Sequence, residues 1–243
     1  YGLMTGFPTG RDSASLKATV DLTYRPPIKE FHGVFAMRLL KYTPLDPSTP
    51  AIDVNGSVVM HFDPQKRYVK LGEPSNRINA KIGPLASVGA YLMFGSELPP
   101  APEPPGSITA KLGPIAADRD MKVTSGEGVI AGAQAKFNTG EKTFAIFYGK
   151  VNALVGFDAS MLKYSDELSC GAIKPVGVDY WYANLQMYAE LDAEIGIKTK
   201  LGPAEVKAQI FKAQAWALLK AGAPNPTWAA GAIAGNYNVL GGL

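Results

Sequence analysis

Cysteine and histidine are nearly absent from this sequence. Cys170 is the only cysteine among 243 residues, and the two histidines are His32 and His61. One cysteine excludes an internal disulfide framework and a zinc site made of several cysteines. Neither histidine has a second ligand at metal-binding spacing. We expect no metal and no cofactor, and we expect Cys170 to pack as a small apolar residue; a thiol nucleophile with His61 as its base is the weaker alternative.

Long apolar runs and clustered charge are missing as well. The net charge is +3, from 24 basic and 21 acidic residues that are scattered along the chain, so nucleic acid is not an expected partner. No stretch approaches the roughly 20 apolar residues of a membrane helix, and no signal-peptide pattern opens the chain. With 26 Gly, 19 Pro and 47% apolar residues, the composition is typical of a folded, turn-rich protein. Because the sequence begins at Tyr1 and not at Met, we expect it to be a processed product or a piece of a longer chain.

The first half of the chain reads as a series of separate strands. Residues 17–24 alternate apolar and polar side chains, which is the period of a half-buried strand, and Pro26 and Pro27 end it. Similar patterns predict strands over residues 31–40, 57–62, 68–71 and 90–94.

A proline-rich segment follows. Residues 98–106 hold five prolines, which forbids a strand with a complete hydrogen-bond ladder and favours an extended spacer. We interpret it as a surface loop, with a domain linker or a ligand for a proline-binding partner as alternatives. The predicted organisation is an N-terminal β region (1–97), this loop or linker (98–106) and a long-stranded β region (107–243), and one continuous domain is equally compatible with the length.

The second half carries the clearest pattern. One side of residues 143–161 is apolar almost throughout. The alternation is sharper over residues 180–201, where Trp181, Leu185, Met187, Leu191 and Ile195 oppose polar residues. A helix would mix the two sets, so the period predicts strands of about 20 residues, with Gly149, Gly156 and Gly196 as places to bend. For residues 205–221 we favour a strand over a helix, followed by a turn at 222–226 and a returning strand over 228–240. The predicted fold class is all-β: a long antiparallel meander that forms a curved sheet, a sandwich or a barrel.

Two surfaces are candidates for function, because no catalytic set is recognisable. The apolar side of the long strand, with Trp181, Leu185, Met187, Leu191 and Ile195, is a candidate interaction face. Tyr180, Tyr182 and Trp228 are candidates for an aromatic surface, since amphipathic rings suit carbohydrate or interfacial contacts. Carboxylates such as Glu190, Asp192 and Glu194 are interpreted as the solvated side of a sheet.

Three segments resemble a known group of proteins: residues 147–158 (FYGKVNALVGFD), 181–190 (WYANLQMYAE) and the stretch from 224–228 (PNPTW) to 235–241 (GNYNVLG). They are similar to a region of very large, largely uncharacterised exported proteins of Bacteroidetes-type bacteria. The resemblance covers most of the chain and supplies no catalytic residues. It implies an extracellular or cell-envelope setting and a longer parent chain.

We therefore expect a non-enzymatic structural or interaction module of a large exported envelope protein, which serves in scaffolding, adhesion or assembly. Its expected partners are other protein chains or further domains of the same chain. The second hypothesis is a β-trough that handles lipid or another apolar ligand, or a segment of an outer-membrane barrel; an enzyme of unknown type is the third. What the apolar side of the long strands contacts decides between the first two.

Overall fold

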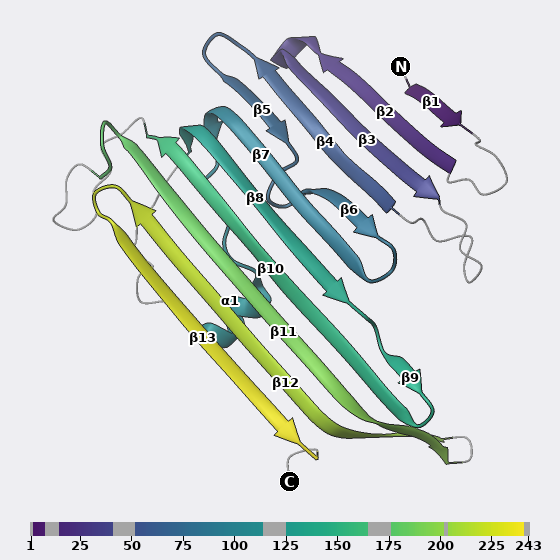
Figure 1. The fold of residues 1–243 in the computed structure, drawn as a ribbon. Helices are drawn as coiled ribbons and strands as arrows, with labels where there is room; N and C mark the ends of the chain where they lie inside the picture. The colour runs from purple at the N-terminus through teal and green to yellow at the C-terminus, as the bar shows by residue number, and fades with distance from the viewer. Residues whose placement is uncertain are drawn as a thin grey trace.

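The described residues form one large antiparallel sheet. The computed structural model describes residues 2–7, 15–40, 52–113, 125–164, 176–201 and 204–240. These ranges contain thirteen strands, one α-helix and one short 3-10 turn, which are labelled in Figure 1. The strands are β1 (Gly2–Phe7), β2 (Ser15–Arg25), β3 (Glu30–Leu40), β4 (Ile52–Phe62), β5 (Arg67–Leu71), β6 (Ile78–Ile82), β7 (Ala86–Leu98), β8 (Gly126–Asn138), β9 (Lys142–Phe144), β10 (Phe147–Lys163), β11 (Trp181–Leu201), β12 (Ala204–Ala223) and β13 (Trp228–Val239). The 3-10 turn is η1 (Pro26–Ile28) and the helix is α1 (Gly106–Leu112).

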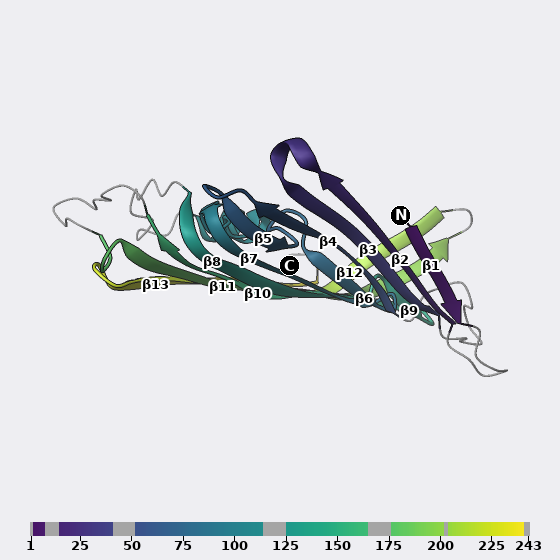
Figure 2. The same cartoon turned by 90° about the horizontal axis from the view of Figure 1, so that it is seen from above.

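The strands follow one another as a meander. Their order across the sheet is β1-β2-β3-β4-β5-β7-β8-β10-β11-β12-β13, while β6 pairs with β4 and β7, and β9 pairs with β10. Figure 2 shows that the strands bow and that the sheet twists, as expected for strands of L-residues. The all-β meander is confirmed, and of the three forms we expected, the described residues have the curved sheet.

The sheet continues across the predicted linker. β7 precedes the proline-rich segment and β8 follows it, yet the two strands pair from Ala86–Phe137 to Gly95–Gly128. The segment itself lies against the sheet, because Pro104 is buried and the Pro102 carbonyl accepts a hydrogen bond from Gln186 Nε2 at 2.8 Å. It leads directly into α1.

The long strands of the second half are present, with one correction. β11 and β12 are 21 and 20 residues long, and β12 confirms the strand that we favoured over a helix. A register shift between Ile195 and Gly196 provides one of the expected bends. The prediction of a single strand over residues 143–161 is wrong: a turn with Ala145 at φ 54° separates β9 from β10. This two-residue turn pairs Phe144 with Phe147 and so reverses which alternate residues share a side, which periodicity alone did not show.

The buried core lies on the side of the sheet that carries α1. One cluster gathers Tyr91, Met93, Leu98, Ile130, Leu162, Tyr164, Val176 and Tyr182, and a second gathers Ile108 of α1 with Tyr188, Trp216 and Leu218. In Figure 1 the helix lies behind β11 and β12. The side of the sheet that faces the viewer is therefore the one opposite α1.

Candidate functional site: an open apolar face

One side of the sheet is apolar from β2 to β13. The cross-strand register fixes which residues share this side. A single line of paired residues crosses it: Leu22, Gly33, Val58, Leu71, Leu92, Ala131, Ala159, Leu185, Ala221 and Ala229. Because side chains alternate along each strand, we define the apolar face as alternate residues 18–24 of β2, 31–37 of β3, 52–62 of β4, 69–71 of β5, 78–82 of β6, 86–94 of β7, 129–137 of β8, 147–161 of β10, 181–195 of β11, 211–221 of β12 and 229–239 of β13.

No charged, amide or aliphatic hydroxyl side chain lies on the apolar face so defined. It consists of Ala, Gly, Val, Leu, Ile, Met and aromatic residues alone. Charge begins at the margins: Lys163 pairs with both Trp181 and Glu127 at one end of the strands, and Arg67 pairs with Phe62 at the same end. Near the other end, Lys142 of the short strand β9 pairs with Gly149. The sheet thus presents a continuous hydrocarbon surface with charges at its margin.

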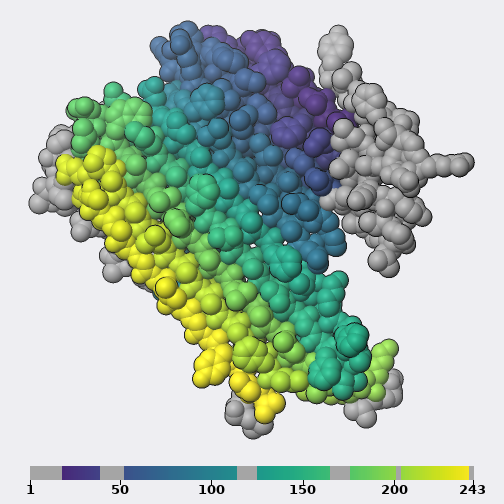
Figure 3. Space-filling model, viewed as in Figure 1, coloured from purple at the N-terminus to yellow at the C-terminus, as the bar shows by residue number. Residues whose placement is uncertain are grey.

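The apolar face is open to solvent. Val155 is 58% exposed, Phe157 43% and Ile233 86%, and Figure 3 shows this face of the molecule. Among the described residues, no second layer covers it. With strands about 4.8 Å apart and a rise of about 3.3 Å per residue, ten strands by ten residues give roughly 1,500 Å². Monomeric proteins rarely expose apolar patches larger than a few hundred Å², so this surface needs an occupant.

Two shallow hollows lie on the apolar face between β7 and β13. Their volumes are about 1000 Å³ and 740 Å³. Small residues such as Ala133, Ala189 and Ala217 line the larger hollow together with bulky Phe157 and Met187. Alternating small and large side chains therefore give the face relief as well as hydrophobicity.

The predicted interaction residues all lie on the apolar face. Leu185, Met187, Leu191 and Ile195 are between 38% and 52% exposed. Trp181 lies at the end of the face, in register with Lys163. Sequence reasoning missed the contribution of β8, whose Ala and Gly residues gave only weak alternation, and it did not connect the strands of the two halves into one surface.

The predicted aromatic surface is not formed as expected. Tyr182 is fully buried, so its assignment to a surface is wrong. Its hydroxyl donates to the Pro226 carbonyl at 3.0 Å and accepts from Trp228 Nε1 at 2.8 Å. Tyr180 is 45% exposed and lies in the turn before β11. Tyr182 and Trp228 act as a brace for the turn between β12 and β13.

The opposite side of the sheet holds a buried polar network that the sequence did not reveal. Arg77 Nη2 lies 2.7 Å from Asp158 Oδ1, and Tyr91 donates its hydroxyl proton to the same oxygen at 2.9 Å. Gln186 Nε2 donates to Asp158 Oδ2 at 3.0 Å as well as to Pro102. Arg77 also stacks over the Tyr91 ring. The network ties β7, β10 and β11 to the proline-rich segment.

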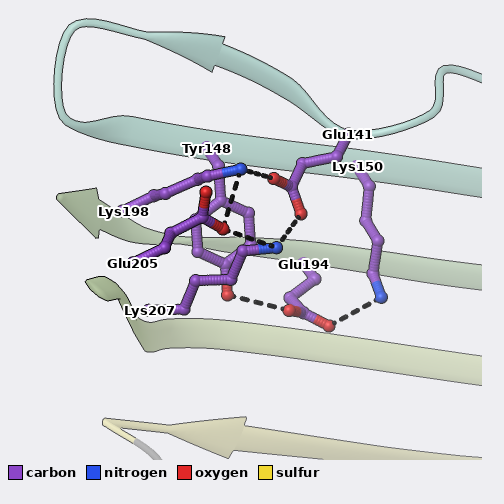
Figure 4. A network of polar contacts seen from close by, with 7 residues as sticks. All are labelled: Glu141, Tyr148, Lys150, Glu194, Lys198, Glu205 and Lys207. Atoms are coloured by element: carbon purple, nitrogen blue, oxygen red, sulfur yellow. Dashed lines mark hydrogen bonds and ion pairs between the residues drawn. The ribbon is translucent and has the colours of Figure 1, made fainter. Parts of the chain in front are cut away.

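A second polar network lies near the ends of β9 to β12 and is drawn in Figure 4. Glu141 accepts from Lys207 at 2.7 Å and from Lys198 at 2.9 Å, and Lys198 also pairs with Glu205 at 3.0 Å. The hydrogen bonds from Lys207 and then Lys198 lower the pKa of the Glu141 carboxyl. Glu194 on the same side accepts from the Tyr148 hydroxyl. These charges lie on the polar side and leave the apolar face uncharged.

Of the residues that were considered for catalysis, the structure describes His61 and Glu190. The His61 ring stacks on Tyr68 at 5.1 Å, and Glu190 accepts a hydrogen bond from Ser107 at 2.7 Å. Within the described ranges, no three His, Cys, Asp or Glu side chains are grouped so that they could hold a metal ion. Cys170, with the neighbouring Asp166 and Glu167, lies outside the described residues, so its expected packing stays a prediction.

Of the helical residues that the structure describes, none belongs to a helix with the length and hydropathy needed to cross a bilayer. Comparison with protein-family models, with curated proteins and with solved structures found no match.

Proposed function

We propose that this chain handles lipid: acyl chains of phospholipids cover its apolar face. The observation that carries the proposal is the exposed, continuous face without one charged or amide side chain from β2 to β13. Hydrocarbon needs no hydrogen bond and no charge partner, so it matches the aliphatic and aromatic side chains that make up this face.

A protein partner matches the surface less well. Protein interfaces place polar groups throughout the contact, and even homodimer interfaces are only about 65% apolar. On the apolar face, the only polar side-chain groups that such a partner meets are the hydroxyls of Tyr24 and Tyr237 and the indole N–H of Trp181. The larger hollow is lined by alanines and by bulky residues such as Phe157 and Met187. Flexible acyl chains can adapt to such an uneven apolar surface.

A structural module is the second candidate function. The polar side of the sheet is already covered in part by α1 and the proline-rich segment. A second apolar layer, supplied by another chain or another domain, would complete a layered domain around the open face. This is the scaffolding or assembly role expected from the long alternating strands and the lack of a recognisable catalytic set. An extracellular or envelope setting, which the resemblance implies, remains a prediction under both proposals.

Binding of a fluorescent phospholipid tests the lipid proposal. The 243-residue chain is incubated with phosphatidylethanolamine that carries a fluorophore on its headgroup, and bound lipid is measured by co-elution in size-exclusion chromatography. Met187→Glu places a charge in the larger hollow and is expected to lower bound lipid at least tenfold. Ala110→Glu adds the same charge on exposed α1, at the opposite side of the sheet, and is expected to leave binding unchanged.

Two results would count against the proposal. If the unaltered chain carries no lipid above background, the face has another occupant and the structural candidate gains support. If Met187→Glu and Ala110→Glu bind as much lipid as the unaltered chain, the lipid contacts some other part of the molecule.

A further inference from the structure

Within the described residues, the outer edge of β13 shows none of four common protections against strand pairing, namely shortness, charge, a bulge or proline. The strand is 12 residues long and contains no Lys, Arg, Asp, Glu or Pro. Its register with β12 runs from Gly222–Trp228 to Phe211–Val239 without a bulge. Edge strands are usually shortened, charged, bulged or interrupted by proline, because an open edge pairs readily with another strand.

Backbone groups of alternate β13 residues point away from the sheet. The Leu240 amide donates to the Ile210 carbonyl of β12 at 2.7 Å. Because backbone direction alternates in an antiparallel pair, Val239, Tyr237 and the alternate residues before them direct their N–H and C=O groups outward. Among the described residues, these groups face no neighbouring strand.

We propose that β13 pairs antiparallel with β13 of a second copy of this chain, about a two-fold axis at Ala234. This register places large side chains opposite small ones on the apolar face: Ile233 faces Gly235 of the second copy, Tyr237 faces Gly231, and Val239 faces Ala229. Registers centred on Ile233 or Gly235 lose this match, since they oppose Ile233 to itself or to Tyr237.

Charge does not oppose this pairing. β13 carries no charged side chain, so its antiparallel self-pairing brings no like charges together. An axis perpendicular to the sheet keeps both apolar faces on the same side. The dimer would therefore have one apolar face of twice the width. The proposed pairing does not depend on lipid binding, so an experiment can disprove one of these two proposals and leave the other intact.

Cysteine cross-linking tests the register. In a Cys170→Ser background, Ala234→Cys places two thiols directly across the axis in a non-hydrogen-bonded pair, where Cα atoms are about 4.5 Å apart, within disulfide range. Ala230→Cys is the matched control, because Ala230 and Ala234 both pack against the cluster around Ile108. Its two copies would lie eight residues apart along the strands, about 26 Å. Mild oxidation is expected to give a covalent dimer only with Ala234→Cys.

Sedimentation of variants at the β13 edge and on the apolar face tests which of these two surfaces forms the dimer. Ile233→Pro removes an outward N–H without breaking a bond to β12, and proline is tolerated at such edge positions. Leu219→Lys adds charge on the same apolar face one strand inward and leaves the edge intact. The unaltered chain and Leu219→Lys are expected to sediment as dimers, and Ile233→Pro as a monomer.

Several results would overturn the edge pairing. These are a monomeric unaltered chain, equal cross-linking of both cysteine variants, no cross-linking of Ala234→Cys, or a dimer of Ile233→Pro. A monomeric Leu219→Lys together with a dimeric Ile233→Pro would show association through the apolar face instead.

Discussion

At the scale of single residues, the polar side of the sheet depends on a buried ion pair. Asp158 is 1% exposed and its carboxylate accepts hydrogen bonds from Arg77, Tyr91 and Gln186. A buried charge is costly unless it is paired and hydrogen-bonded, so each partner is needed once the other is present. Asp158 could be predicted only as one polar residue among alternating ones, and Arg77 lies outside any strand, so no sequence signal joined them.

Breaking this pair is expected to cost stability. Asp158→Ala leaves Arg77 buried without its partner and should lower the free energy of unfolding by about 3–5 kcal/mol in urea titrations. The double variant Arg77→Met with Asp158→Leu removes both charges and should recover most of that loss. A change below about 1 kcal/mol for Asp158→Ala would show that water or relaxation compensates the charge.

Two glycines in the neighbouring strands β8 and β10 are expected to differ in how much an alanine substitution changes stability. An added Cβ at Gly132 would overlap with Asp158 Oδ1 and would lie 2.6 Å from the Tyr91 ring. At Gly149 the nearest atom to an added Cβ is the Glu194 carbonyl oxygen at 3.7 Å. Gly132→Ala should therefore destabilise the fold by about 1–3 kcal/mol through overpacking. Gly149→Ala, as the control, should be neutral or slightly stabilising, since glycine weakens a strand interior. Equal effects in urea titrations would contradict this difference.

The buried phenol of Tyr164 is expected to make the protein less stable at alkaline pH. Burial raises the pKa of its phenol to about 12, and its hydroxyl has no hydrogen-bond partner among the described residues. Tyr164 therefore contributes to the free energy of unfolding in full below pH 10, which is about the pKa of a tyrosine phenol in the unfolded chain. This contribution is lost as the pH rises toward 12. Unfolding measured between pH 9 and 12 should show a shallower decline for Tyr164→Phe. An unchanged decline would show that Tyr164 does not contribute to it.

At the scale of elements, strands in which bulky apolar and polar residues alternate could be predicted from the sequence, whereas strands rich in small residues could not. β11 and β12 were recognisable because bulky apolar residues alternate with charged ones over some 20 positions. β8 was not, because Gly and Ala occupy much of both its sides, and tertiary pairing with β7 and β10 decides its structure. The seven-residue α1 has no side-chain N-cap hydrogen bond, so its start carries no sequence signal.

The helix is expected to depend on one anchor. Ile108 of α1 is fully buried against Tyr188, Trp216 and Leu218. Ile108→Ala should cost about 2–5 kcal/mol and should increase hydrogen exchange in residues 106–112. Lipid bound at the apolar face should not change, because α1 lies on the other side. A loss of lipid binding in a folded Ile108→Ala variant would mean that the two sides are coupled.

At the scale of the whole molecule, one side of the sheet is packed and partly covered, and the other side is exposed. The polar side has a core, buried hydrogen bonds and a covering helix, whereas the apolar side has none of these in the described residues. The alternation predicted that each long strand has two sides. It could not show that eleven strands align their apolar sides, because register and the parity change at Ala145 are properties of pairing and not of any single strand.

Quenching by brominated lipid tests most directly whether acyl chains cover the apolar face. Two single-tryptophan chains are compared in the presence of phospholipid brominated along its acyl chains. One keeps only Trp216, which is buried on the side of α1; the other has Met187→Trp and phenylalanine at the three native tryptophan positions. We predict strong quenching of the tryptophan at position 187 and little of Trp216. Equal quenching of both, or none of either, would contradict the proposed role of the apolar face.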